Sequence, residues 1–322
     1  MLNNPLVTIG ITAYNAADTI GRAIRSALAQ SWQPIEIVVV DDCSTDDTND
    51  VLLQLSVVHP ELRIFCNQNN GGVAVSRNRI ITEAKGEFVA FFDDDDESLP
   101  ERITTQLWRI LTYERDFANE APVICHTART LSYPGGVERV ESTMGERERR
   151  CAPHNMEVAE RILLGTFVED GYGACPTCSQ MARLSTYQDV GGFDPAFRRS
   201  EDTELNVRLA KAGAHFIGVA KPMVLQTMTK TNDKSLADEC RFAQMLLEKH
   251  RDIADKYDMF DFCRRWIDIK FAWLEGRKFD FVRGFLSQSL KHPKFVYLRF
   301  SSALPNIGLN RAFSRFYQRN EG

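Results

Sequence analysis

Four consecutive aspartates, Asp93–Asp96, are the residues whose type and spacing point most directly to chemistry. They follow residues 88–92 (FVAFF), an apolar run with the length and composition of a buried strand. The carboxylates are therefore expected at the carboxyl end of a strand, where open α/β sheets bind their ligands. Adjacent carboxylates repel one another, and a hard cation such as Mg2+ or Mn2+ relieves that repulsion while leaving coordination positions for phosphate oxygens. The first hypothesis is a metal–diphosphate site.

The same run has a simpler interpretation, because runs of acidic residues are commonly solvated loops. Pro100 is a typical first residue of a helix, and Glu101 would then lie in the first turn, so the aspartates could also serve as a helix cap. Their position directly after a buried strand favours the metal site.

The elements that must position these acids alternate between strand and helix. Apolar runs predict strands at 6–12, 35–40, 62–66 and 88–92. Helices are expected after Asp18, after Ser44/Thr45, and over 73–84 with Gly86 as the stop. This alternation predicts a doubly wound, mostly parallel sheet. Its carboxyl edge would collect a polar set that comprises Thr12, Tyr14, Asn15, Asp41, Asp42, Asn69, Asn70 and Asp93–Asp96.

A nucleotide diphosphate needs such a set: an aromatic face for the base, acceptors for base N–H and ribose hydroxyls, and a cation for the phosphates. Arg77 could add a positive charge, although a surface arginine on its helix is the alternative. The sequence contains neither GxxxxGK[ST] nor GxGxxG after the first strand, so a P-loop and a dinucleotide fingerprint are both excluded.

Six motifs in order carry a resemblance to a known family. Four of them are TAYN (12–15), VVVDDCSTDDT (38–48), NNGGVAVSRN (69–78) and KGEFVAFFDDDDESLP (85–100). The others are VGGFDPAF (190–197) and SEDTELNVRLAKAG (200–213). Together they resemble the successive motifs of family 2 glycosyltransferases with the GT-A fold, including that family's glycine-rich turn and "ED" helix. The resemblance covers about residues 5–230.

The resemblance implies roles in donor binding for matching positions. Thr12 and Tyr14 would line the base pocket, and Asp42 would contact the base with Asp41 beside it. Asp93 or Asp94 would contact the ribose. Asn15 and Arg77 complete the expected nucleotide-binding set.

The resemblance also implies the catalytic groups. Asp95 would ligate Mn2+ or Mg2+, and Asp202 would be the catalytic base with Glu201 as its neighbour. Asp96 falls where the family often has a second acid. Residues 224–236 lack the histidine that some relatives use as an additional metal ligand.

General chemistry agrees with a base at Asp202. Inverting sugar transfer needs a base at the acceptor hydroxyl and charge stabilisation on the departing diphosphate. Ser200 is expected as the N-cap of a helix over 201–212 that buries Leu205 and Leu209 and stops at Gly213, with both acids in its first turn.

The segment 115–185 is expected to build the acceptor pocket, with Glu169–Tyr172 as a candidate wall and a hairpin formed by 123–131 and 137–141. His126 and His154 have no partner at metal-ligand spacing in the sequence, so both are interpreted as structural.

Composition is that of a globular protein, with 43% hydrophobic and 26% charged residues. We expect a GT-A catalytic domain over 1–235, with a donor half at about 1–115 and an acceptor half at about 116–235, followed by a helical region over 236–322. Without an export signal the chain is interpreted as cytoplasmic, and its eight cysteines as reduced thiols. The CxxC at Cys175 and Cys178 lacks a second pair, which argues against a zinc ribbon.

Charge is unevenly distributed along the chain. Residues 277–322 hold nine Lys or Arg against two acids, whereas the rest holds 30 basic and 42 acidic residues. Basic and aromatic residues alternate over 291–322, which suits an anionic membrane surface. A packed terminal helix with a basic outer face is the equal alternative, and nucleic acid is disfavoured by the acidic body.

The sequence thus predicts an inverting, metal-dependent glycosyltransferase that moves a sugar from a nucleotide-diphosphate sugar, with a UDP-sugar as the expected donor. The acceptor would be a glycan or lipid-linked hydroxyl in bacterial surface polysaccharide synthesis. The alternatives are a non-catalytic sugar-nucleotide-binding protein of the same fold and a sugar-nucleotide pyrophosphorylase. The pyrophosphorylase is expected to carry a glycine- and lysine-rich loop after the first strand, where this chain has TAYNAAD.

Overall fold

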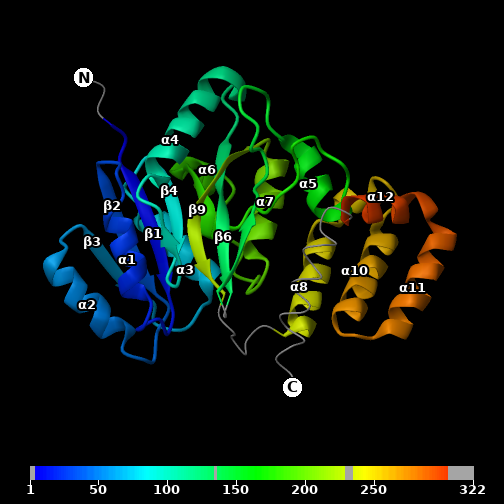
Figure 1. Ribbon diagram of the computed structural model, residues 1–322, viewed down its shortest axis with the longest axis horizontal. Coiled ribbons are helices and arrows are strands. Elements are labelled where there is room, and N and C mark those ends of the chain that lie inside the picture. Colours follow the sequence, from blue (N-terminus) through cyan, green and yellow to red (C-terminus); the bar gives the residue numbers. More distant parts are fainter. Residues whose placement is uncertain (1–3, 134–135, 229–234, 304–322) are drawn as a thin grey trace. The chain divides into compact units, whose positions relative to one another are not determined.

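The computed structural model describes residues 4–133, 136–228 and 235–303 (Figure 1). The chain forms two compact units. The first consists of Met1–Val158 and Glu169–Asn232, and the second of Ala159–Val168 and Asp233–Gly322. The second unit therefore includes a short stretch from the middle of the chain, which the sequence did not single out.

The first unit begins with a parallel half-sheet of strand order β3-β2-β1-β4. Its strands are β1 (Val7–Ala13), β2 (Ile35–Asp41), β3 (Leu62–Cys66) and β4 (Phe88–Asp93). The connecting helices are α1 (Ile20–Leu28), α2 (Thr48–Val58) and α3 (Val73–Glu83). The predicted strands and the 73–84 helix are confirmed to within a residue at each end, because long apolar runs and helical periodicity are strong signals.

The second half of the sheet is mixed in direction and continues from β4 in the order β8-β6-β9-β5. It comprises β5 (Glu97–Ser98), β6 (Val123–Tyr133), β7 (Val137–Glu141), β8 (Gln180–Arg183) and β9 (His215–Thr227). Strand β8 runs antiparallel to β4 and β6, while β6 and β9 are parallel. The expected hairpin is confirmed as the antiparallel pair β6–β7. The expected α/β fold is therefore confirmed, but its sheet contains more antiparallel pairs than the sequence suggested.

The segment after the acidic run differs from the sequence expectation. Residues Glu97–Ser98 form β5 and pair antiparallel with β9, and helix α4 (Arg102–Tyr113) begins two residues later than Pro100. Arg102 explains this start: it is fully buried and donates to the Ser98 hydroxyl and to the Phe91 carbonyl at 2.9 Å each. The aspartates are therefore not caps of α4.

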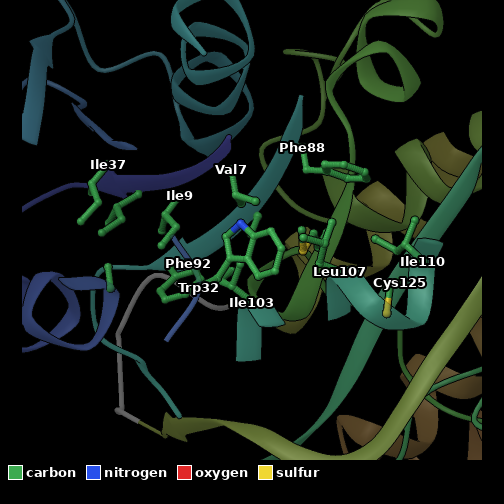
Figure 2. Packing of buried hydrophobic residues seen from close by; sticks show 14 of the residues in the cluster. Val7, Ile9, Trp32, Ile37, Phe88, Phe92, Ile103, Leu107, Ile110 and Cys125 are labelled. Atoms are coloured by element: carbon green, nitrogen blue, oxygen red, sulfur yellow. The ribbon is translucent and has the colours of Figure 1, made fainter. Parts of the chain in front are cut away.

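The core lies between the parallel half-sheet and α4, and Figure 2 shows its side chains. Ile9 from β1, Phe92 from β4 and Leu107 from α4 are at most 3% exposed. They gather around Trp32, whose indole N–H donates to the Pro5 carbonyl at 3.1 Å. This packing fixes the carboxyl ends of β1 and β4, where the candidate site lies.

Two of the expected helix boundaries are wrong in detail. Helix α1 begins at Ile20 after Thr19, so Asp18 is not its N-cap. Helix α2 begins at Thr48 after Asp47, because Ser44 is used elsewhere: its hydroxyl donates to Asp41. The loop after β2 is thus longer than the sequence indicated.

Glu36 on β2 forms a buried polar junction at the opposite end of the strands. Its carboxylate accepts hydrogen bonds from the Thr8 hydroxyl at 2.6 Å, the Lys85 amide at 2.6 Å and Arg63 at 3.0 Å. Gly86 is required here for close approach, since a Cβ would lie 2.5 Å from the Thr8 nitrogen. The expectation that Gly86 is a helix stop is therefore wrong.

The remaining helices of the chain are α5 (Asn155–Leu164), α6 (Leu184–Asp189), α7 (Glu201–Lys211), α8 (Leu236–Lys249), α9 (Arg251–Asp255), α10 (Phe260–Leu274), α11 (Lys278–Lys291) and α12 (Pro293–Ala303). Helix α10 lies between α8 and α11 in the second unit (Figure 1). The predicted helical character of this region is confirmed. Within the described residues, no helix is long and apolar enough to cross a membrane.

Helix α12 contains part of the basic and aromatic segment. The Phe295 ring contacts Phe262 of α10 with centroids 5.3 Å apart, and Arg299 donates to the Leu163 carbonyl. Tyr297, in contrast, is 75% exposed. The described part of the segment is therefore packed on one side, while residues 304–322, with the remaining arginines, lie outside the described residues.

Candidate functional site

The strand register brings the predicted polar residues to one edge. Thr12 of β1 is paired with Asp93 of β4, and Ala13 is paired with Asp41 of β2. The backbone N–H of Tyr14 donates to the Asp94 carboxylate at 3.1 Å. The Tyr14 ring is 46% exposed. An aromatic face and the acidic run therefore stand side by side at the carboxyl ends of β1 and β4.

Three of the expected nucleotide-binding residues hold the loops of this edge. Asp42 accepts from the Asn67 amide at 2.7 Å and from the Gly72 backbone N–H at 2.7 Å. Asp41 accepts from the Ser44 backbone N–H at 3.1 Å. Asn15 accepts from the Thr45 backbone N–H at 2.8 Å. These side chains thus shape the turns beside Tyr14, a role that the sequence reading did not include.

The negative charges of the acidic run are not all balanced by hydrogen-bond donors or cations. Burial and the charge of Asp95 raise the pKa of Asp94 to about 7, although Tyr14 donates to it. Burial, with the charges of Asp93 and Asp95, raises the pKa of Asp96 to about 8. Asp96 is 3% exposed, and within the described chain neither of its carboxylate oxygens has a hydrogen-bond partner. A buried carboxyl group without a donor is costly, and a cation would compensate it.

A group of possible metal ligands forms around Asp96. Ligand atoms of Asp93, Asp96 and Cys178 all lie within 4.8 Å of one another, whereas Asp95 is not part of this group. Burial raises the pKa of the Cys178 thiol, so this sulfur stays protonated and is a poor ligand. The two carboxylates are the ligand type of Mg2+ and Mn2+. The residues present therefore fit a hard divalent cation.

Arg77 joins this run to a distant part of the chain. Its guanidinium donates to Asp93 at 3.1 Å and to Glu201 at 2.8 Å, and it lies 5.4 Å from the Phe193 ring centroid. Arg77 is 5% exposed, so the alternative of a surface arginine is wrong. A buried arginine with two carboxylates fixes α3, β4 and α7 relative to one another.

Asp202 lies in the first turn of α7. Its carboxylate accepts from the Thr203 backbone N–H at 2.6 Å and from the Thr203 hydroxyl at 3.1 Å. Burial raises the pKa of Glu201 despite the neighbouring Arg77. Ser200 precedes the helix with φ +59° and makes no side-chain cap hydrogen bond, so the expected serine cap is wrong while the helix itself is confirmed.

The glycine-rich turn holds α7 in place. Arg208 donates to the carbonyls of Val190 and Gly192 at 2.7 Å each. At Gly192 a Cβ would lie 2.3 Å from the Asn78 side chain, and φ is +69°. Asn78 in turn donates to the Phe193 carbonyl at 2.8 Å. Only glycine fits this contact between α3 and the turn.

The family model of glycosyl transferase family 2 matches residues 8–151. The chain contains a family 2 glycosyl transferase domain. The resemblance carried by the sequence motifs is thereby confirmed. The matched part of the family 2 domain includes Arg77 and the acidic run, and α7 follows beyond it.

Curated bacterial proteins resemble part of the family 2 domain. The putative teichuronic acid biosynthesis glycosyltransferase TuaG of Bacillus subtilis is 39% identical over 103 residues, which are 32% of this chain and 41% of TuaG. The Escherichia coli UDP-Glc:alpha-D-GlcNAc-diphosphoundecaprenol beta-1,3-glucosyltransferase WfaP is 42% identical over 104 residues, 32% of this chain and 40% of WfaP. The chain thus matches less than half the length of these relatives.

A solved structure supports the fold over a longer range than the sequence relatives do. Staphylococcus aureus TarS 1-349 matches with a TM-score of 0.55 at 20% identity, covering 88% of this chain and 75% of that one. At this identity the likeness concerns the fold alone.

Proposed function

We propose that this protein is an inverting glycosyltransferase that transfers a sugar from a nucleotide-diphosphate sugar to a hydroxyl group. The observation that carries the proposal is the Arg77 bridge between Asp93 and Glu201. It connects the acidic end of β4 with the first turn of α7, so a diphosphate group and an acceptor base can serve one reaction centre.

Asp202 is the proposed base. It would accept the proton of the acceptor hydroxyl as that oxygen bonds to the anomeric carbon. The bond from the anomeric carbon to the diphosphate breaks from the opposite face, and a nucleoside diphosphate leaves. Attack from the face opposite the leaving group inverts the configuration. Glu201 and Arg77 hold the first turn of α7 in position for this step.

Asp95 is the proposed ligand for Mg2+ or Mn2+, with Asp93 and Asp96 close by. When bound, the ion would neutralise charge on the departing diphosphate. The unpartnered, buried carboxylate of Asp96 and the raised pKa of Asp94 support a cation at this place. The ribose contact is assigned to Asp93 or Asp94, as the family resemblance implies.

We propose that the nucleoside diphosphate part of the donor is UDP. TarS 1-349, which shares the fold, has been solved with UDP and with UDP-GlcNAc, and WfaP is named for a UDP-Glc donor. In this chain the half-exposed Tyr14 ring would stack on the base, beside Thr12. Asp42, through the turn it builds, would set the depth of the pocket.

The proposed acceptor is a glycan or a lipid-linked glycan of a bacterial surface polysaccharide. TuaG is named for teichuronic acid biosynthesis, and the name of WfaP gives an alpha-D-GlcNAc-diphosphoundecaprenol acceptor. The Glu169–Tyr172 segment would form a wall of its pocket. Attachment to the inner face of the plasma membrane through residues 291–322 is part of this proposal. Within the described residues, this segment consists mainly of the packed helix α12.

A calorimetric titration with UDP, GDP, dTDP and CDP, each with and without Mn2+, tests the donor site. We expect tight binding of UDP that depends on Mn2+ and weakens strongly in Asp95→Ala. Binding of UDP with equal affinity in EDTA would remove the metal from the proposal. Binding of UDP-sugars without hydrolysis or transfer to any member of an acceptor panel would instead favour the non-catalytic alternative. Formation of a UDP-sugar from UTP would favour the pyrophosphorylase.

A further inference from the structure

A second group of metal-ligating side chains lies in the first unit, away from the acidic run. Ligand atoms of Cys151, His154 and His215 all lie within 4.8 Å of one another. The Cys151 sulfur is 3.8 Å from Nδ1 of His154. Sulfur and nitrogen ligands of one tetrahedral zinc ion are about 3.6 Å apart, given bonds of about 2.3 and 2.05 Å. His154, which the sequence interpretation treated as structural, thus has two possible partner ligands close by.

The two imidazole rings are held in place by the surrounding backbone. His154 and His215 form an isolated antiparallel bridge, and their rings stack with centroids 4.5 Å apart and an interplanar angle of 15°. The Asn155 N–H donates to the Ala214 carbonyl at 3.2 Å, and the Phe216 N–H donates to the Pro153 carbonyl at 2.8 Å. The ligand geometry is thus preformed by main-chain hydrogen bonds.

Further hydrogen bonds orient the rings, as is usual around metal-binding histidines. The Tyr113 hydroxyl lies 2.8 Å from His215 Nδ1, which leaves Nε2 of this ring for a metal. The same hydroxyl is 3.7 Å from the Cys151 sulfur. His154 Nδ1 lies 2.9 Å from the Ala152 carbonyl oxygen, and this hydrogen bond is given up when Nδ1 binds a metal.

The cluster lies at the opposite edge of the sheet from the donor site. His215 is the first residue of β9, whereas β5 and the acidic run adjoin Val224–Leu225, near the end of that strand. Cys151 and His154 belong to the connection between β7 and α5, and Tyr113 ends α4. A metal at this place is remote from the acidic run and would tie the connection between β7 and α5 to the start of β9.

We propose that Cys151, His154 and His215 bind one Zn2+ ion, with a water molecule as the fourth ligand. One thiolate and two imidazoles are a soft and borderline ligand set, which favours zinc over the hard cation proposed for the acidic run. The bound ion joins the 146–154 connection to the start of β9. It stabilises the folded state because the three ligands are brought together only there.

The test compares two cysteine variants of the full chain after removal of metals by a chelator. Zn2+ is titrated by calorimetry, and Co2+ is used as a spectroscopic probe for sulfur-to-cobalt charge transfer. We expect one zinc site in the wild type, loss of at least 100-fold in affinity in Cys151→Ser, and loss of the charge-transfer band. Cys66→Ser is the matched control, because Cys66 is also exposed and lies outside the cluster. It should behave as the wild type.

A second variant separates binding from misfolding. His154→Gln removes a half-buried ligand and should weaken zinc binding by at least 10-fold, while its circular dichroism in chelator equals that of the wild type. Zinc should also raise the thermal midpoint of the wild type more than that of either variant. Wild-type zinc affinity in Cys151→Ser would overturn the proposal, because it would show that the ion binds without this thiolate. Absence of stoichiometric zinc in the wild type would overturn it as well.

Discussion

Arg77 is the residue at which the two acidic parts of the candidate site meet. Its side chain is buried, and both of its partners, Asp93 and Glu201, are substantially shielded from water. Removing one member of such a pair destabilises the folded state strongly, because it leaves a buried charge without a counter-charge. The free energy lost in this way is larger than the net stabilisation that the intact pair provides. Its main contribution is therefore positional, and its removal should be visible in stability as well as in activity.

Arg77→Ala should lower the free energy of unfolding by about 3–5 kcal/mol, since it leaves two neighbouring carboxylates without their cation. Urea unfolding followed by circular dichroism measures this difference. Arg79→Ala is the control, because Arg79 lies on the same helix with a side chain 41% exposed and pairs with Glu83; it should cost about 0.5 kcal/mol. Equal stability of the two variants would show that the bridge is absent in solution.

Asp202→Asn tests the proposed base. The amide cannot accept the hydroxyl proton, so the transfer rate should fall by about 100- to 10 000-fold while UDP affinity is retained. Asp189→Asn, at an exposed carboxylate at the end of α6, should leave both quantities unchanged. Transfer assays at saturating donor and calorimetry with UDP give the two measurements, and a wild-type rate in Asp202→Asn would remove this residue from the mechanism.

At the scale of elements, Glu36 joins β1, β2 and the segment leading into β4. Burial raises its pKa, but hydrogen bonds from Thr8, the Lys85 amide and Arg63 outweigh this effect, and the net pKa is lowered. A lowered carboxyl pKa contributes stability above the unfolded-state pKa of about 4.3, and that contribution is lost as the pH falls through the folded-state value.

Glu36→Gln should therefore destabilise the protein by about 1–3 kcal/mol at pH 7, because several donors lose a charged acceptor. The difference from the wild type should shrink as the pH falls below the unfolded-state pKa and through the lowered folded-state pKa, where the wild-type carboxylate itself becomes protonated. Unfolding by urea at pH 7 and at pH 3.5 measures it. Glu101→Gln, an exposed residue without a side-chain cap hydrogen bond, is the control. A difference that does not change with pH would contradict the assigned role of the charge.

The elements that could be predicted from the sequence are those with a local signal. Long apolar runs gave β1 to β4, and the helical period gave α7. Strand β5 could not be predicted, because two residues become a strand only through pairing with β9. The same reason applies to the zinc cluster, whose third ligand lies far along the chain from the Cys151–His154 pair, and to the partners of Arg77. Predictions of helix caps were wrong where the side chain forms a tertiary hydrogen bond instead, as the Ser44 hydroxyl does with Asp41.

At the scale of the whole molecule, the segment matched by the family model is not a complete folding unit. Residues 8–151 include β4 and β6, but β8 and β9, which pair with them, come later in the chain. We expect a fragment ending at 151 to aggregate, because strand edges are left unpaired. A fragment ending at 232 retains the complete sheet and should be more soluble. Sedimentation and circular dichroism compare them, and a monomeric, fully folded short fragment would contradict this expectation.

Deletion of 304–322 tests the proposed membrane surface without removing α12. The deleted segment contains Arg311, Arg315 and Arg319 and one acidic residue. We expect weaker binding to vesicles that contain anionic lipid, with a difference that disappears at high salt, because each basic residue near such a surface contributes about 1 kcal/mol. The full-length chain on neutral vesicles is the control. Unchanged binding to anionic vesicles would assign membrane contact, if any, to another surface.

The order of the strands along the chain also determines how long each strand waits for its partner during synthesis. Residues 97–98 leave the ribosome long before their partners at 224–225, and at 5–20 residues per second the delay is roughly 6 to 25 s. Throughout that interval β5 has no partner strand, and for much of it the free edge of β4 also lacks its neighbour β8. Charged residues beside an open edge discourage pairing with other chains. The four aspartates would thus protect the nascent protein before they serve any ligand in the finished one.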